Sequence, residues 1–248
     1  IVFGDWSSDV CSSDLADWVP SKPNTSLYIR PNMFASEAFL GVHPAEEYIF
    51  TIILSPVGNY FSAGQNGISI HVEEEFSRAA EGGTGGSKAA GNYAGSFCAA
   101  SRAAKEGCDQ VLWLDGKEHK YIEEIGAMNV MFRIGEEVLT PKLDGNFLAG
   151  ITRDSVIQLL RHQDIQVTER RISMEEIMSA IESRELKECF GTGTAAVVTP
   201  IGALCFRGTR YEIENQGASS IAIKIHDELT GIQYGARPDS FGWIEKVE

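Results

Sequence analysis

The sequence predicts an α+β fold built on a mixed or antiparallel β-sheet. Strand-like segments outnumber helix-like ones, and the two types do not alternate in the regular βαβ order of a parallel sheet. Apolar residues make up 43% of the 248 residues and charged residues 23%, which is typical of a folded globular chain and excludes extensive disorder. The length suits one large domain or two smaller ones.

The first fifteen residues, Ile1–Leu15, differ from the rest of the chain. The segment contains Ser-Ser-Asp twice and has neither the basic nor the apolar region of a secretory signal. It is interpreted either as a polar tail or as foreign sequence joined to a truncated gene. The missing initiator Met favours foreign sequence, so the segment is left out of the fold prediction.

Two strand-like segments follow. In Thr25–Arg30 apolar and polar residues alternate, and Pro31 is expected to end the strand. Glu47–Val57 is an apolar, β-branched run that predicts a buried strand closed by Pro56. Gly58–Gly67 is rich in Gly, Asn and Ser, which predicts a linker.

Short strands and helices are expected in the remainder. Gly107 is expected to stop the first helix, and Ser173 with Glu176 forms a capping box at the start of the third. The expected helices are Ala99–Lys105, Ser155–His162, Met174–Arg184 and Ser219–Leu229. The expected strands are Ile68–Glu73, Gln110–Leu114, Tyr121–Ile125, Asn129–Ile134, Glu137–Thr140, Ala195–Pro200 and Ala203–Phe206, with a hairpin turn at Asp115–Lys120.

Charge and cysteine content exclude several classes of function. The 21 basic and 35 acidic residues give a net charge of -14, which disfavours binding to nucleic acid or to anionic lipid. No window approaches the ~18 uninterrupted apolar residues of a membrane span. The 5 cysteines are odd in number and form no C-x-x-C pair. Neither a disulfide scaffold nor a metal site is therefore expected, and a cytoplasmic location fits better.

A glycine-rich loop, Gly82–Lys88 (GGTGGSK), ends in a lysine. It is not a P-loop, because Ser87 precedes the lysine and Ala89 follows it, and G-x-G-x-x-G is also absent. A plain surface lysine is one interpretation. However, Ala89–Ser96 is small and nearly uncharged, an environment that favours a neutral, nucleophilic amine over a hydrated ammonium. The aldehyde cofactor that proteins hold as a lysine Schiff base is pyridoxal phosphate.

Pyridoxal phosphate needs three further groups, and each has a candidate. Glu123 or Glu124 could serve the pyridine nitrogen; they are neighbours on one strand, so only one can point into a pocket. Gly150–Thr152 before a helix, or the loop Gly191–Thr194, could bind the phosphate. Arg30 offers a fork for a substrate carboxylate. A solvated strand edge and plain Gly/Thr turns are the ordinary alternatives.

Seven motifs in the chain resemble, in the same order, those of a known family: Thr25–Pro31 (TSLYIRP), Lys88–Tyr93 (KAAGNY), Gln110–Leu114 (QVLWL), Glu124–Asn129 (EIGAMN), Leu148–Arg153 (LAGITR), Phe190–Ala195 (FGTGTA) and Ile232–Gly235 (IQYG). From about Asp17 onward the chain is similar to the branched-chain amino acid aminotransferases, which are fold-type IV (class IV) pyridoxal-phosphate enzymes. The resemblance implies that residues 16–57 are the C-terminal part of a small α/β domain. It also implies an interdomain linker at 58–67 and a complete large pyridoxal-phosphate-binding domain at 68–248.

The resemblance also implies roles for single residues. Lys88 matches the Schiff-base lysine, which also moves protons between cofactor and substrate. Glu124 matches the partner of the pyridine nitrogen, which leaves Glu123 as its outward neighbour, and Tyr93 matches the tyrosine at the cofactor's phenolic oxygen. The remaining cofactor-binding matches, at the phosphate, are Ile151, Thr152, Gly193 and Thr194. The substrate-binding matches are Tyr28, Arg30, Ala127, Thr194 and Ala195.

The implied activity is transfer of an amino group between Leu, Ile or Val and 2-oxoglutarate, giving branched-chain 2-oxo acids and glutamate, by a homodimer. D-amino acid aminotransferase and aminodeoxychorismate lyase, which share the Lys/Glu core, are alternatives. Some mammalian members carry a redox Cys-x-x-Cys where this chain has Ala196 and Thr199, so no thiol switch is expected.

A second departure lies at the start of the chain. Nothing upstream of Asp17 matches the longer small domain of the family, which supplies an arginine to the phosphate and aromatic residues to the substrate pocket. The chain is therefore interpreted as an N-terminally truncated member that is expected to dimerise poorly and to show little or no transamination. A catalytically inactive fragment is the alternative from another class of function.

Overall fold

The computed structural model describes residues 15–22, 25–58, 67–214 and 217–245. The chain divides into two compact units, residues 1–60 with 245–248, and residues 61–244. Each unit is described by itself. Nearly all of the N-terminal tail Ile1–Leu15 and most of the expected linker Gly58–Gly67 lie outside the described residues.

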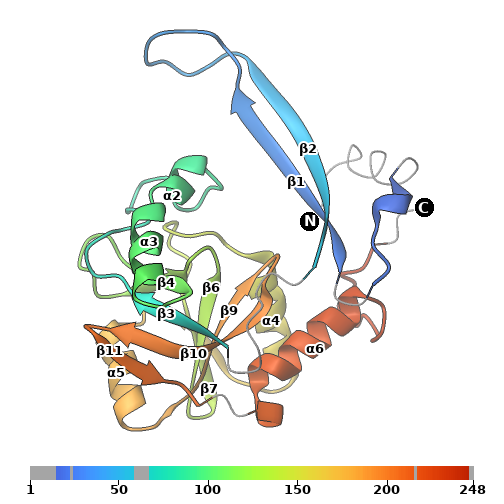
Figure 1. Cartoon of the computed structure of the whole chain (residues 1–248). Coiled ribbons are helices and arrows are strands. Elements are labelled where there is room, and N and C mark those ends of the chain that lie inside the picture. The colour runs from blue at the N-terminus through green and yellow to red at the C-terminus, as the bar shows by residue number, and fades with distance from the viewer. Residues whose placement is uncertain (1–14, 23–24, 59–66, 215–216, 246–248) are drawn as a thin grey trace. The chain divides into compact units, whose positions relative to one another are not determined.

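Unit 1 contains a short 3₁₀ helix, η1 (Ala16–Trp18), and a β-hairpin of β1 (Ser26–Ala35) and β2 (Tyr48–Val57) (Figure 1). The expectation that Pro31 ends the first strand is wrong, because β1 continues through Pro31, which pairs with Ile52. A two-stranded ribbon leaves one edge of each strand free, and there a proline removes no ladder hydrogen bond.

The second strand of unit 1 also differs from its prediction. It was expected to be buried and closed by Pro56, but Pro56 lies inside β2, opposite Leu27, and Phe50 is 59% exposed. The apolar composition was correctly interpreted as a strand. Burial could not be inferred from it, since a hairpin with one partner strand has no second layer of its own to cover its faces.

Unit 2 is built on a 9-stranded mixed sheet with the order β5-β4-β3-β10-β9-β6-β7-β8, in which β11 pairs with β10. β3 runs parallel to β4 and β10, β7 runs parallel to β8, and the other pairs are antiparallel. The strands are β3 (Ile68–Val72), β4 (Gln110–Leu114), β5 (Ile122–Ile125), β6 (Asn129–Ile134), β7 (Glu137–Pro141), β8 (Val167–Arg170), β9 (Leu186–Gly193), β10 (Val197–Phe206) and β11 (Thr209–Glu212). This arrangement confirms the α+β prediction with a mixed sheet.

The helices of unit 2 are α2 (Ala90–Ala94), α3 (Phe97–Lys105), α4 (Ile151–His162), α5 (Met174–Glu182) and α6 (Ile221–Gln233), with a 3₁₀ turn η2 (Gly217–Ser219). Ser173 caps α5 as expected, because its hydroxyl accepts a 3.1 Å hydrogen bond from the Glu176 amide. The Glu176 carboxylate pairs with Arg170, so the second half of the expected capping box is not seen. Gly107 follows α3 with a φ of 77°, the left-handed conformation that glycine adopts freely at the end of a helix. None of the helices in the described ranges is long and apolar enough to cross a membrane.

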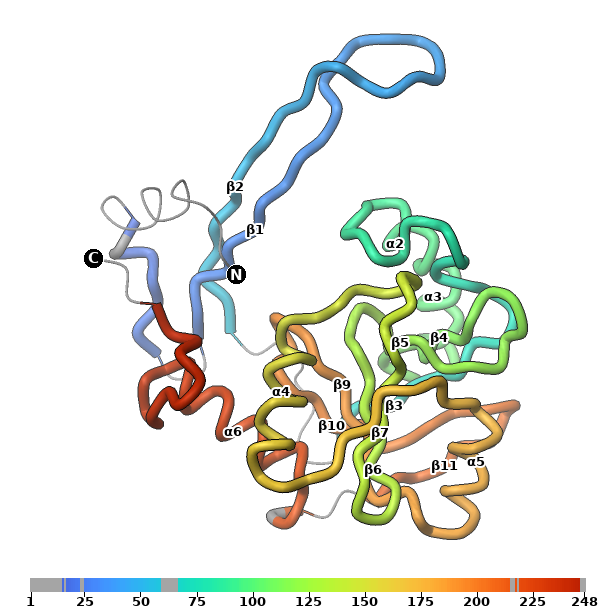
Figure 2. Tube along the Cα trace, turned by 180° about the vertical axis from the view of Figure 1, so that it is seen from behind, coloured from blue at the N-terminus to red at the C-terminus, as the bar shows by residue number. Residues whose placement is uncertain are grey.

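Alternation along the strands distributes the core over both faces of the sheet. Leu112 faces a central cluster that the curled sheet and α5 enclose, whereas its neighbour Trp113 packs under α3. In the same way Phe132 faces the central cluster and Met131 faces α4 and α6. Figure 2 shows α3 beside β4 and α4 beside β9. The sheet is therefore a rigid base from which loops extend.

Two sequence predictions near β9 are corrected. Residues 191–194, expected to form a loop, are mostly strand, and the two strands expected at 195–206 form one strand, β10. The buried charge of Glu188 interrupts the apolar pattern that would have revealed β9. Its carboxylate is compensated by Arg133, by the Ser220 hydroxyl and by two amides at the start of α6.

Candidate active site

The glycine-rich loop lies directly against the backbone of Gly145 and Asn146. A Cβ atom on Gly85 would lie less than 3.0 Å from the Asn146 carbonyl oxygen, and one on Gly86 would lie 3.0 Å from the Gly145 carbonyl oxygen. These glycines are therefore required for a close approach of two backbone segments. The glycine cluster is therefore explained by backbone packing and does not require the phosphate-binding role of a P-loop.

The substitution Gly85→Ala is expected to destabilise unit 2. The added Cβ overlaps a carbonyl oxygen that cannot rotate away, and overpacking of this kind costs about 1–3 kcal/mol. Thermal unfolding should show a lowered midpoint. The matched control is Gly91→Ala, because Gly91 lies in α2 and its Cβ would meet nothing within 4 Å. Equal midpoints for the two variants would contradict the close approach.

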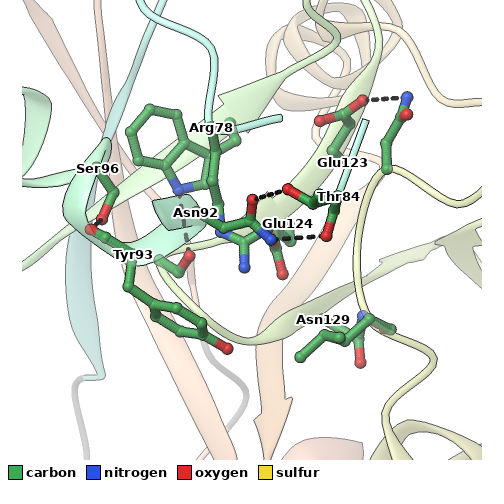
Figure 3. Close-up of polar contacts among 12 residues, drawn as sticks. Arg78, Thr84, Asn92, Tyr93, Ser96, Glu123, Glu124 and Asn129 are labelled. Carbon is green, nitrogen blue, oxygen red and sulfur yellow. Dashed lines mark hydrogen bonds and ion pairs between the residues drawn. The ribbon is translucent and has the colours of Figure 1, made fainter. Parts of the chain in front are cut away.

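A buried asparagine holds the same loop from the other side. The Asn92 amide nitrogen donates to the carbonyl oxygens of Thr84 (2.7 Å) and Ser87 (3.0 Å), and its oxygen accepts from the Thr84 hydroxyl (2.7 Å) (Figure 3). Lys88 is thus placed between a fixed Ser87 and α2. Sequence reasoning quoted Asn92 within a motif but assigned it no function.

The Lys88 amine donates a 3.1 Å hydrogen bond to the Tyr93 hydroxyl. The structure therefore brings together the two residues that were expected to act on one cofactor. The expectation of a buried amine is wrong in this structure, because the Lys88 side chain is exposed. Its neighbours Ala89, Ala90 and Gly91 are too small to cover a long side chain.

Glu124 on β5 pairs with Arg78, which precedes the glycine-rich loop. The side chains are 3% and 2% exposed, and Arg78 Nη1 contacts Glu124 Oε1. The Arg78 guanidinium also lies 5.4 Å from the Tyr93 ring centroid, and the Lys88 amine lies 5.3 Å from the same centroid. Arg78 was not predicted as a site residue. The feature that could have pointed to it is that it is the only arginine between residues 68 and 87 in the sequence.

Burial raises the pKa of Glu124 to about 8, although the positive charges of Arg78 and Lys88 lower it. Arg78 contacts Glu124 and lies near the Tyr93 ring, which Lys88 also approaches, so Glu124 lies in the same part of unit 2 as Lys88.

Glu123 is not the solvated outward neighbour that was expected. Figure 3 shows its side chain extending in a different direction from that of Glu124, but it is only 4% exposed. The Asn146 side-chain amide donates a 2.8 Å hydrogen bond to Glu123 Oε1. Burial raises the pKa of Glu123 to about 7. The segment around Asn146 and Phe147 covers this face of β5, which the spacing of the sequence did not reveal.

Without added ligand, the chain should become less stable as the pH rises from about 5 to about 8.5. Glu123 and Glu124 have folded pKa values of about 7 and about 8, above the ordinary 4.5. Their contribution to stability is complete below the unfolded pKa and is lost as the pH rises through the folded values. Thermal unfolding midpoints across this range should fall, with a shallower slope in Glu124→Gln. A rising midpoint would contradict the assignment.

Arg78 Nη2 and Thr192 Oγ1 are buried and have no hydrogen-bond partner within the described part of the chain. Arg78 Nη1 and Glu124 Oε1 contact each other in the ion pair. Because a buried polar atom without a partner is costly, a polar ligand that reached Arg78 Nη2 or Thr192 Oγ1 would be stabilised there.

Asn129 connects this region to the first turn of α4. Its amide nitrogen donates a 2.9 Å hydrogen bond to the Leu148 carbonyl oxygen, and a Cβ on Gly150 would collide with its amide oxygen. Ile151 and Thr152 are the first residues of α4, and no side chain caps this end. Their amides are among the helix N–H groups that lack an intrahelical partner, which suits them to an anion such as a phosphate.

The turn between β9 and β10 lies beside Asn129, because Thr192 pairs with Asn129 across β6 and β9. Gly193 pairs with Val197, which leaves residues 194–196 as the turn, with Thr194 and Ala195 exposed. Val197 has a φ of 51°, a left-handed conformation that is strained for a β-branched residue.

The β5–β6 turn brings in the last predicted residue of unit 2. Ile125 and Met128 form a β-bridge, and the exposed Ala127 lies at the tip of the turn between them. The structure thus links β5, β6, β9 and the first turn of α4 through neighbouring contacts. All the residues predicted to bind the cofactor lie on or next to these elements, on α2, or on the glycine-rich loop Gly82–Lys88, which is called the Lys88 loop below.

Tyr28 and Arg30 lie on β1 in unit 1. Arg30 Nη2 donates a 2.7 Å hydrogen bond to the Tyr28 hydroxyl, and the guanidinium lies 4.9 Å from the centroid of the tyrosine ring. The pair is therefore a preformed donor group. Its contact with substrate stays a prediction.

Comparisons with known proteins identify the family. The chain matches Amino-transferase class IV over residues 5–204. It is 51% identical over 231 residues to branched-chain-amino-acid aminotransferase 2 of Bacillus subtilis (strain 168), covering 93% of this chain and 64% of that protein. It is 48% identical over 232 residues to a probable branched-chain-amino-acid aminotransferase of Staphylococcus epidermidis, covering 93% of this chain and 65% of that protein.

Solved structures agree. The branched-chain amino acid aminotransferase from Escherichia coli superposes with a TM-score of 0.72 at 28% identity, covering 90% of this chain and 70% of that chain. The T.th. enzyme with pyridoxamine 5'-phosphate superposes with a TM-score of 0.74 at 27% identity, with the same coverage of 90% and 70%. The chain spans about 64–65% of the length of the two curated relatives. On these matches the chain belongs to the class IV aminotransferase family, with a fold-type IV architecture.

Proposed function

We propose that this chain binds pyridoxal 5'-phosphate on Lys88 and transfers amino groups between the branched-chain amino acids Leu, Ile and Val and 2-oxoglutarate. The observation that carries the proposal is the Lys88–Tyr93 hydrogen bond beside the buried Arg78–Glu124 pair. Arg78, which contacts Glu124, lies near the Tyr93 ring to whose hydroxyl the Lys88 amine donates, and Arg78 Nη2 has no hydrogen-bond partner in the described part of the chain. The relatives named as branched-chain aminotransferases support the substrate class.

The residues present fit the cofactor. The Lys88 amine would hold it covalently, the Tyr93 hydroxyl would donate to its phenolic oxygen, and the Glu124 carboxyl group would contact its ring nitrogen. The first amides of α4, with the Thr152 and Thr194 hydroxyl groups, would hold the phosphate. When bound, pyridoxal phosphate supplies an aldehyde and an electron-accepting ring.

The chain's own residues then control protons and orientation. Because burial raises the pKa of Glu124 to about 8, its carboxyl group holds a proton that it can share with a ring nitrogen. Arg78 neutralises this carboxyl group when it ionises and keeps it in place. Lys88 Nζ can accept a proton from the α-carbon of a substrate and return it. The exposed Ala127 and Ala195 leave room for that substrate.

The quaternary state and the compartment are proposals of the same kind. We expect the homodimer of the family to form only weakly in this chain, with Tyr28 and Arg30 contacting the substrate. Cys98, Cys108, Cys189 and Cys205 are free thiols in the described part of the chain. Free thiols fit a reducing cytoplasm.

A coupled assay tests the proposed activity. The purified chain, supplied with pyridoxal phosphate, should form glutamate from 2-oxoglutarate with L-leucine, L-isoleucine or L-valine, and not with D-alanine. Transfer from D-alanine would favour a D-amino acid aminotransferase, and pyruvate formation from aminodeoxychorismate would favour the lyase. Retention of cofactor on Lys88 without turnover of any substrate would favour the non-catalytic alternative.

A further inference from the structure

We propose that Glu123 and Asn146 form a positioning pair that keeps the Lys88 loop in register with Glu124. The proposal rests on the proposed function only in that Lys88 and Glu124 serve one cofactor. Neither Glu123 nor Asn146 is among the residues predicted to bind the cofactor. The pair would act on Lys88 and Glu124 indirectly, by holding the turn at Asn146 and strand β5 in a fixed relative position.

The first observation is a buried polar contact. The Asn146 amide donates to Glu123 Oε1 at 2.8 Å, and the two residues are 8% and 4% exposed. The Asp144 carboxylate accepts from the Asn146 backbone amide at 3.0 Å, which holds the turn that presents Asn146. Because both side chains are largely buried, removal of one partner leaves the polar group of the other without an equivalent hydrogen bond within the chain.

The second observation concerns the backbone of the same turn. The carbonyl oxygens of Gly145 and Asn146 are the surface against which Gly86 and Gly85 pack. Asn146 therefore contacts β5 through its side chain and the Lys88 loop through its main chain. Any shift of this turn relative to β5 displaces the loop as well.

The third observation is the register of β5. Trp113 on β4 pairs with Glu124 and Leu114 pairs with Ile122, so Glu123 is the extra residue of a β-bulge. The β4–β5 ladder does not fix a bulged residue, and bulges re-aim neighbouring side chains. The hydrogen bond from Asn146 supplies the missing constraint at the residue next to Glu124.

The two aspartates near Glu123 disfavour a negative charge on its carboxyl group. Asp144 and Asp115 raise the pKa of the Glu123 carboxyl group, and Asn146 and Arg78 lower it. The carboxyl group of Glu123 has an oxygen that can accept the hydrogen bond from Asn146 whether it is ionised or protonated. The side-chain amide of a glutamine at this position has such an oxygen too. The positioning role thus requires an acceptor at position 123 and no charge.

Hydrogen–deuterium exchange of the whole chain, without cofactor, tests the pair. In Glu123→Leu, residues 82–92 should exchange faster by at least about fivefold, because the Asn146 amide loses its buried acceptor. Glu123→Gln should stay within about twofold of the parent chain, because it keeps that acceptor. Asn146→Leu should reproduce the effect of Glu123→Leu, and it also provides the test if Glu123→Leu does not fold. The double variant should be no worse than either single one.

Thr140→Val is the matched control, because it removes another buried hydrogen bond of unit 2, from the Thr140 hydroxyl to the Val130 carbonyl oxygen. It should leave exchange in residues 82–92 unchanged. The proposal is overturned if Glu123→Leu accelerates that segment no more than Thr140→Val does, or if Glu123→Gln accelerates it equally. Affinity for pyridoxal phosphate should fall in Glu123→Leu and be restored in Glu123→Gln. Failure of the proposed function would appear as cofactor trapping on another lysine and would leave the exchange result intact.

Discussion

Lys88→Ala is expected to abolish covalent attachment of pyridoxal phosphate to the chain. The substitution removes the amine that donates to Tyr93 but creates no cavity, because the Lys88 side chain is exposed. The absorbance band of the lysine-bound cofactor should disappear, while the thermal unfolding midpoint without cofactor changes little. Surface substitutions of this kind usually alter stability by less than about 0.5 kcal/mol.

The matched control for this result is Lys105→Ala. Lys105 lies in the last turn of α3 and is exposed as well. It should keep both the absorbance and the stability of the parent chain. If Lys88→Ala retained the absorbance, the amine that holds the cofactor would be a different one.

Glu124→Gln should lower the rate of amino-group transfer by about 10²–10⁴-fold, the usual contribution of a positioned acid–base group. The amide has nearly the same shape but cannot supply a proton to a ring nitrogen as a carboxyl group does. It also leaves the buried charge of Arg78 without its counterion. The measurement is turnover of leucine and 2-oxoglutarate at saturating cofactor.

Glu123→Gln provides the comparison, since it makes the same chemical change at the next residue. It should change the rate by less than about threefold, because an amide still accepts the hydrogen bond from Asn146. Equal losses in the two variants would mean that Glu123, too, contacts the reacting groups. The direction assigned to each side chain of β5 would then be wrong.

Local sequence patterns predicted much of unit 2. Alternation located β3, the polar turn Asp115–Lys120 located the hairpin of β4 and β5, and β6 and β7 were predicted as short strands. Ser173 located the start of α5 through a hydrogen bond that the structure contains. Such signals succeed because they depend on neighbours in the sequence. Lys88, Tyr93 and Glu124 were identified from motifs; in the structure Lys88 contacts Tyr93, and Arg78 lies near Tyr93 and contacts Glu124.

The rest depended on contacts between segments far apart in the sequence. Arg78 and Asn146 lie in polar or glycine-rich stretches that resemble ordinary loops until β5 packs against them. The role of Asn92 depends on its hydrogen bonds to the glycine-rich loop. The burial of Glu123 depends on the segment around Asn146, which is distant in the sequence and hydrogen-bonds to its side chain. The exposure of β2 was mispredicted for the opposite reason, since its apolar composition says nothing of whether a second layer covers it.

The most direct test of the central claim, that Lys88 holds the cofactor beside Glu124, is reduction of the cofactor-loaded chain with borohydride and mapping of the modified peptide. Reduction makes the lysine–cofactor bond permanent, so the modified residue can be identified without any turnover. The result expected is a single phosphopyridoxyl group on Lys88 that is absent in Lys88→Ala. Modification of Lys105, Lys120 or another lysine in place of Lys88 would contradict the account.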